Sequence, residues 1–120
     1  MIRLKPEFAP SYIALGIYYR EVAKLNWFLK KFAASFFGGL PDGTLEDSRD
    51  ALLIALELDP DFIITHYEIG KTYRDLDEFD KSNYHFKKVL ELDIRDHSDQ
   101  SKKYKVNKMI SDNNLKAEKE

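Results

Sequence analysis

The feature that most constrains the fold is internal repetition at two different spacings. The segment Leu56-Glu57-Leu58-Asp59 returns 34 residues later as Leu90-Glu91-Leu92-Asp93. The segment Leu15-Gly16-x-x-Tyr19-Arg20 returns as Ile69-Gly70-x-x-Tyr73-Arg74, but 54 residues later. Repetition at such periods predicts a stack of similar supersecondary units. The 20-residue difference between the two spacings predicts one insertion, which lies between Tyr19 and Leu45.

The shorter spacing is the period of the tetratricopeptide repeat, in which each unit is a pair of antiparallel helices, A and B. Its pattern, W-x2-L-G-x2-Y followed by A-x3-F and P, can be placed twice on this chain. The first unit fills these places with Tyr12, Leu15, Gly16, Tyr19, Ser48, Leu52 and Pro60. The second unit fills them with His66, Ile69, Gly70, Tyr73, Ser82, Phe86 and Ile94. The chain therefore resembles a tetratricopeptide-repeat protein.

This pattern predicts an all-α fold of two helical hairpins and a C-terminal capping helix, with the first helix lengthened by the 20-residue insertion. The repeat domain spans residues 1–95, and its parts are the end of a preceding repeat (1–8), unit one (9–62) and unit two (63–95). A capping helix follows over 96–112 and a frayed tail over 113–120. The half-repeat at 1–8 favours a fragment of a longer protein.

Gly16 and Gly70 occupy the same place in the two predicted A helices. A glycine inside a helix costs about 1 kcal/mol relative to alanine. Its presence at both places predicts that a neighbouring helix approaches each A helix closely there.

The insertion is rich in aromatic residues and ends in a Gly/Pro loop. On a helical wheel, Leu25, Phe28, Leu29, Phe32 and Phe36 form one stripe. The favoured interpretation is a continuing helix whose stripe packs on helix B and the neighbouring unit. The alternative is an apolar patch for lipid or a membrane surface, made by Trp27, Phe28, Phe32 and Phe36.

The order of elements narrows the resemblance. Tyr12-x-x-Leu15-Gly16, Glu21 to Trp27, Lys30-Lys31-Phe32-Ala33 and Phe37-Gly38 are similar to the tetratricopeptide domain of the regulator of microtubule dynamics family. The resemblance covers about residues 9–110. It implies a helical adaptor domain without catalytic residues, in which some relatives handle partner proteins or lipids. It does not carry over microtubule binding, because no partner-contact motif can be mapped residue by residue.

Composition argues against several kinds of chemistry. The chain has no cysteine, and its three histidines lack ligand spacing, so we predict no metal, no cofactor and no enzymatic activity. His66 is expected to be a packed, hydrogen-bonded residue. A net charge of −2 gives no general argument for nucleic acid. No stretch has the length and apolarity of a signal or a membrane span, which favours a soluble, cytoplasmic protein.

The leading functional hypothesis is a scaffold or adaptor that binds a peptide or partner helix in the groove lined by the A helices. The residues predicted to line this groove are Ile13, Ile17, Arg20, Tyr67, Lys71 and Arg74. Its cations suit an acidic-apolar ligand. The alternative is a lipid-binding module that uses the aromatic patch. A third possibility is self-association through an exposed apolar face near Ile2, Leu4, Phe8 and the first A helix.

Overall fold

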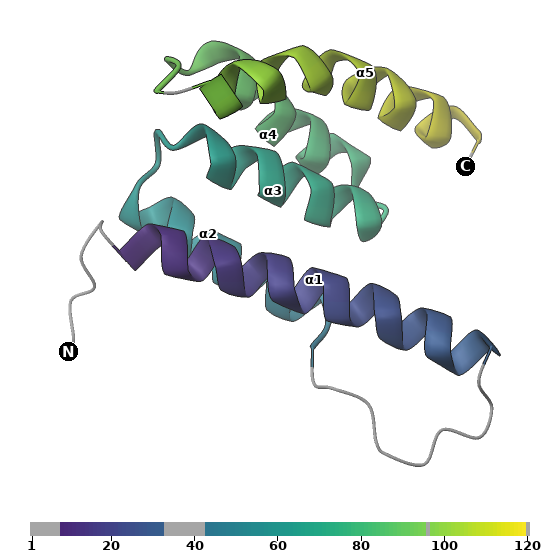
Figure 1. Ribbon diagram of the computed structural model, residues 1–120. Coiled ribbons are helices and arrows are strands. Elements are labelled where there is room, and N and C mark those ends of the chain that lie inside the picture. Colours follow the sequence, from purple (N-terminus) through teal and green to yellow (C-terminus); the bar gives the residue numbers. More distant parts are fainter. Residues whose placement is uncertain (1–7, 33–42, 96, 120) are drawn as a thin grey trace.

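The computed structural model describes residues 8–32, 43–95 and 97–119 (Figure 1). Within these ranges the chain forms five α-helices and no strand, so the prediction of an all-α fold is confirmed. The helices are α1 (Ala9–Phe32), α2 (Leu45–Leu58), α3 (Ile63–Asp75), α4 (Phe79–Glu91) and α5 (His97–Lys119).

Successive helices run in opposite directions and pack against one another (Figure 1). Helix α1 packs on α2, α2 on α3, α3 on α4 and α4 on α5. Helix α3 also contacts α1 on one side and α5 on the other. The odd-numbered helices therefore form one layer, and α2 and α4 form a second layer behind it in Figure 1.

Local sequence signals set the ends of the central helices. The Thr44 hydroxyl caps α2 by accepting a hydrogen bond from the Asp47 main-chain N–H. The Thr44 main-chain N–H donates to the Asp47 carboxylate, which completes a capping box. Helix α2 ends at Leu58, because Pro60 disfavours helical backbone in the residue before it. The turn from α3 to α4 places Asp77 at φ 61°, a left-handed conformation that aspartate tolerates better than most residues.

The two mid-helix glycines lie where helices cross closely, as the sequence predicted. A methyl group on Gly16 would overlap the side chain of Leu52 on α2. A methyl group on Gly70 would overlap the ring of Phe86 on α4. Leu52 and Phe86 are themselves fully buried, so neither has room to move aside. Equivalent glycines thus meet equivalent large residues in the two helix pairs.

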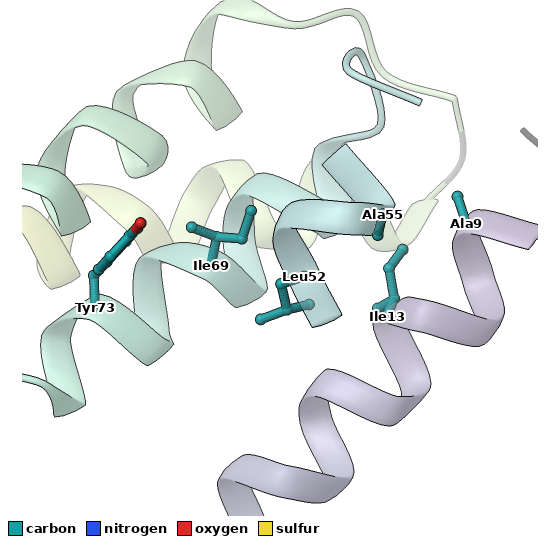
Figure 2. Close-up of a cluster of buried hydrophobic side chains, with 6 residues drawn as sticks. All are labelled: Ala9, Ile13, Leu52, Ala55, Ile69 and Tyr73. Atoms are coloured by element: carbon teal, nitrogen blue, oxygen red, sulfur yellow. The ribbon is translucent and has the colours of Figure 1, made fainter. Parts of the chain in front are cut away.

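The buried side chains form two clusters on either side of α3. Figure 2 shows the first, which joins α1, α2 and α3 through Ala9, Ile13, Leu52, Ala55, Ile69 and Tyr73. The second joins α3, α4 and α5 through Ile63, Tyr67, Phe86, Val89 and Val106. Helix α3 contributes to both clusters and is the centre of the domain.

The first helix is lengthened as predicted, at least as far as Phe32. The part of α1 that corresponds to α3 in the repeat ends at Glu21. Helix α1 continues beyond this point, from Val22 to Phe32. Leu25 and Phe28 on this extension are 48% and 53% exposed. The interpretation that the aromatic stripe packs into the core is therefore wrong at these two residues. Phe36 lies outside the described residues.

The last helix is longer than predicted. It continues to Lys119, whereas the sequence indicated a capping helix over 96–112 and a frayed tail from 113. Asn113 accounts for the difference. Its amide is fully buried and donates to Ser82 Oγ and Asn83 Oδ1 on α4, at 2.9 Å each. A polar residue that looks suited to solvent instead fixes this part of α5 to the domain.

Candidate functional site

The six residues predicted to line a groove divide into buried and accessible groups. Ile13 is 5% exposed and belongs to the first core cluster, and Arg20 and Tyr67 are 3% and 7% exposed. The prediction that these three line an open groove is wrong, because neighbouring helices cover them. Ile17 is half-buried and packs against the same cluster. Lys71 and Arg74 keep part of their surface exposed.

Arg20 is held inside the domain by α3. Its Nη2 lies 2.7 Å from Glu68 Oε1, and its Nη1 donates to the Glu68 main-chain carbonyl at 3.2 Å. A longer bond reaches Thr72 Oγ1 at 3.4 Å. Several bonds to one guanidinium compensate for removing its charge from water. Arg20 therefore joins α1 to α3 and does not present a charge to a ligand.

Lys71 shares the same carboxylate. Its Nζ lies 3.2 Å from Glu68 Oε1 and 4.7 Å from the ring centroid of Tyr67. Burial lowers the pKa of Lys71, and the adjacent Glu68 carboxylate opposes that shift. With a carboxylate and an aromatic face already in contact, Lys71 has less capacity to bind an external anion than its sequence position suggested.

Arg74 lies beside cations of α5 that the sequence interpretation did not include. Together they surround a hollow of about 300 Å³ between α3 and α5. This α3–α5 hollow is lined by Arg74, Tyr104, Lys105, Lys108, Met109 and Asp112. Three cations face one carboxylate, and the Tyr104 side chain is 86% exposed. The lysines looked like an ordinary solvated helix face, because sequence alone did not place α5 beside Arg74.

Two residues of the predicted aromatic patch line a second hollow. This aromatic hollow measures about 570 Å³ and is lined by Ala23, Lys24, Trp27, Phe28, Leu45 and Asp75. Trp27 is 62% exposed. Lys24 Nζ and Asp75 Oδ2 are 3.3 Å apart, so an ion pair lies at an otherwise apolar site. The side chain of Phe32 and all of Phe36 lie outside the described residues.

A third hollow lies along the first turns of α1. It measures about 350 Å³ and is lined by Phe8, Ser11, Tyr12 and Leu15, which we call the open face of α1. Phe8 and Leu15 are 44% and 38% exposed. This is the part of the predicted apolar face that the structure describes.

His66 and His85 form a buried pair between α3 and α4. Their Nδ1 atoms are 3.0 Å apart, and His66 Nε2 lies 2.8 Å from the carbonyl oxygen of Pro60. The prediction that His66 is packed and hydrogen-bonded is confirmed. Burial lowers the pKa of both rings, and that of His85 falls to about 4. Among the described residues, no group of three or more histidines and carboxylates is arranged to hold a metal ion.

The described helices can be compared with the requirements of a membrane-spanning helix. None of them combines the length and the apolarity that a bilayer crossing requires.

These observations define the class of the chain as an all-α domain of five packed helices with an elongated first helix. The profile described as regulator of microtubule dynamics protein 1-3 matches residues 2–114. The chain belongs to the regulator of microtubule dynamics family, as its sequence pattern indicated.

Relatives in two branches of the family are similar to the chain. It is 38% identical to human regulator of microtubule dynamics protein 2 over 78 residues, which is 64% of this chain and 19% of that protein. The mouse protein 2 is 32% identical over 111 residues, 92% of this chain and 27% of the relative. Mouse regulator of microtubule dynamics protein 3 is 33% identical over 92 residues, 76% of this chain and 20% of the relative. The chain thus spans about a fifth to a quarter of these relatives. No solved structure matches it.

Proposed function

We propose that this chain is a non-catalytic tetratricopeptide-type interaction module that binds an acidic segment of a partner protein on the layer of α1, α3 and α5. The observation that carries the proposal is the convergence of Arg74, Lys105 and Lys108 on the α3–α5 hollow. The proposal retains the general location of the groove expected from the sequence, but moves its cationic end from α1 to α5.

The tetratricopeptide assignment is supported by the two glycine crossings. In each helical pair, a glycine of the first helix lies against a large residue of the second helix. Gly16 contacts Leu52 and Gly70 contacts Phe86, and the two contacts join the same two repeat positions. Stacked helical pairs of this kind expose a broad surface along their A helices, which suits an extended or helical ligand.

The α3–α5 hollow offers a partner both charge and apolar surface. Arg74 Nε lies 3.6 Å from Asp75 Oδ1, a separation that leaves most of the guanidinium donors for another group. Tyr104 and Met109 add apolar surface beside the cations. A carboxylate can bind a guanidinium through two parallel hydrogen bonds, so aspartate or glutamate side chains on a partner are the expected ligands.

Affinity capture with matched charge variants tests this proposal. The variant Arg74→Glu with Lys105→Glu reverses two charges at the hollow, and Lys87→Glu with Lys116→Glu reverses two exposed charges elsewhere. We expect the wild type and the second variant to retain the same proteins from a cell lysate and the first variant to lose them. The captured segment should be acidic, and its affinity should fall with added salt. Equal retention by both variants would show that the hollow is not the binding site.

A second candidate function is the binding of an apolar or lipid molecule in the aromatic hollow. The observation that favours it is the size of the hollow, about 570 Å³, together with the exposed Trp27 and Phe28 at its wall. Ligand pockets of proteins commonly have this volume and an apolar lining. Exposed aromatic side chains beside a lysine also suit a membrane surface.

Tryptophan fluorescence distinguishes this candidate, because Trp27 is the single tryptophan of the chain. Phosphatidylcholine vesicles, with or without phosphatidylserine, should shift its emission to shorter wavelengths if the hollow receives lipid. Phe28→Asp should abolish the shift, whereas Tyr84→Asp, at a 57% exposed aromatic on α4, should not. An emission spectrum that vesicles leave unchanged would remove the candidate.

A further inference from the structure

The charged side chains on the layer of α1, α3 and α5 differ in whether they have a partner within the chain. On α3, Lys71 Nζ lies 3.2 Å from the carboxylate of Glu68. Lys105, Lys108 and Asp112 of α5 are exposed, and among the described residues none of these three forms an ion pair. Their charges are therefore available to a group from outside the chain.

The order of the residues along α5 explains why Lys108 and Asp112 do not pair with each other. They are four residues apart, which places them about 6 Å apart along one side of a helix. An acid four residues before a base pairs well, whereas a base four residues before an acid pairs less well. Both side chains line the α3–α5 hollow, together with Lys105 of α5 and Arg74 of α3.

The hollow therefore has a positive part and a negative part. Arg74, Lys105 and Lys108 provide the positive part, and Asp112 provides the negative part about one turn further along α5. A segment that carried carboxylates along its whole length would place one of them against Asp112, at a cost from like-charge repulsion. A segment with a basic residue at that place would gain an ion pair instead. The hollow thus favours a ligand whose charges are in one fixed order.

We propose that Asp112 is a specificity-determining residue of the α3–α5 hollow, and that the partner segment carries one basic residue beyond its acidic residues. This inference rests on the proposed function, because it requires that Arg74, Lys105 and Lys108 bind the acidic residues. To match Lys108 and Asp112, the two kinds of charge on the ligand should lie about 6 Å apart, which is the span of four helical or two extended residues.

Selection from a phage-displayed library of random peptides against the full 120-residue chain tests the order of charges. The enriched peptides should be acidic and should carry Lys or Arg on one constant side of the acidic residues, about two or four positions away. Selection against Asp112→Asn should enrich acidic peptides without that basic residue. Asp93→Asn is the matched control, because Asp93 is an exposed aspartate that does not line the hollow, and it should give the wild-type result.

Fluorescence anisotropy with one enriched, labelled peptide then tests the contact itself. Asp112→Asn should weaken binding about twofold to fivefold, the effect of one solvent-accessible ion pair. Replacing the basic residue of the peptide by Glu should weaken binding to the wild type, and Asp112→Lys should restore it. The circular dichroism of each variant should be unchanged, because Asp112 is exposed.

Two kinds of result would separate this inference from the proposed function. Acidic peptides that lack a basic residue at a constant position, or whose binding the charge exchange does not restore, would overturn the role of Asp112 alone. Enriched peptides without acidic residues, or with equal affinity for the wild type and for Arg74→Glu with Lys105→Glu, would overturn the hollow as a site for acidic segments and this inference with it.

Discussion

The guanidinium of Arg20 on α1 and the carboxylate of Glu68 on α3 form a buried ion pair, with Nη2 and Oε1 2.7 Å apart. The two side chains are 4% and 8% exposed. Because both charges have lost their water, the loss of Glu68 would remove the buried counter-charge of Arg20, whereas Glu68 also has Lys71 within 3.2 Å. This pair joins the first helical pair to the second, beside the buried apolar cluster of α1, α2 and α3.

Glu68→Gln is expected to lower the free energy of unfolding by about 3 kcal/mol, because Arg20 would lose its buried counter-charge and keep only the exposed Glu21 at 3.7 Å. Urea denaturation followed by circular dichroism measures the change. Glu91→Gln is the control, since Glu91 pairs with Lys88 on the surface with 65% of its side chain exposed, and it should have little effect. A similar midpoint for the two variants would contradict the buried role of Glu68.

Gly70→Ala should destabilise the domain although alanine is the better helix former. The new methyl group would overlap the Phe86 ring, which is fully buried and cannot rotate away. Overpacking of this kind costs about 1–3 kcal/mol, more than the roughly 1 kcal/mol that alanine gains in helix propensity. Thermal unfolding should show a lower midpoint for Gly70→Ala and a slightly higher one for Ser101→Ala on the exposed side of α5. A midpoint for Gly70→Ala above that of the wild type would disprove the close crossing.

The histidine pair should make stability depend on pH between about 4 and 6.5. The pKa of His85 falls from 6.5 to about 4 because of burial first, and then because of positive charge on His66 and Lys88. His66 is shifted in the same direction, chiefly by burial, with Pro60 and Asp61 opposing the shift. In this window the unfolded chain binds more protons than the folded chain, so stability is complete above pH 6.5 and is lost as the pH falls.

The loss should reach about 2 kcal/mol at the lower end of this window. Urea unfolding at several pH values measures it, and His85→Phe should give a shallower pH dependence than the wild type. Parallel profiles for the two proteins would assign the dependence to other groups.

Asn113→Ala should loosen the second half of α5. The buried Asn113 amide donates to Ser82 Oγ, which in turn donates to the Gly70 carbonyl at 2.7 Å. Its loss removes a chain of hydrogen bonds that joins α3, α4 and α5, at a cost of about 1–2 kcal/mol. Hydrogen exchange should become faster for the amides from residue 111 onward, whereas the exchange of α2 should not change. Uniform exchange across the chain would indicate a global effect instead.

The helical architecture was readable from sequence because its signals are local and repeated. The two repeated glycines predict close helix crossings from a few neighbouring residues, and both crossings are present in the structure. The ends of α2 are likewise set by local signals, the Thr44 capping box and Pro60. The all-α class and the elongated first helix follow from such signals.

The candidate site was harder to predict because its contacts cross between distant segments. A helical wheel places Arg20 away from the core stripe, yet its partner Glu68 lies 48 residues further along the chain. The position of Ile13 on the predicted helix likewise indicates a groove residue, but α2 and α3 cover it. The lysines of α5 line a candidate binding hollow only because Arg74 of α3 lies beside them. The helical periodicity of either segment does not predict that the two helices are neighbours. Asn113 shows the converse, because a residue type typical of solvent became part of the interior.

The position of the α1 extension bears on how its length can vary. Its last turns, from Val22 to Phe32, lie beyond the crossing of Gly16 with Leu52, and the next helix begins only at Leu45. Val22 and Lys24 still contact the domain, the first as a buried side chain and the second through Asp75, whereas Leu25, Trp27 and Phe28 are exposed. A longer connection after them would cost little, because doubling its length costs only about 0.6 kcal/mol in closure entropy. The length of this arm can therefore change at its exposed end while the packing of α2 to α5 stays the same.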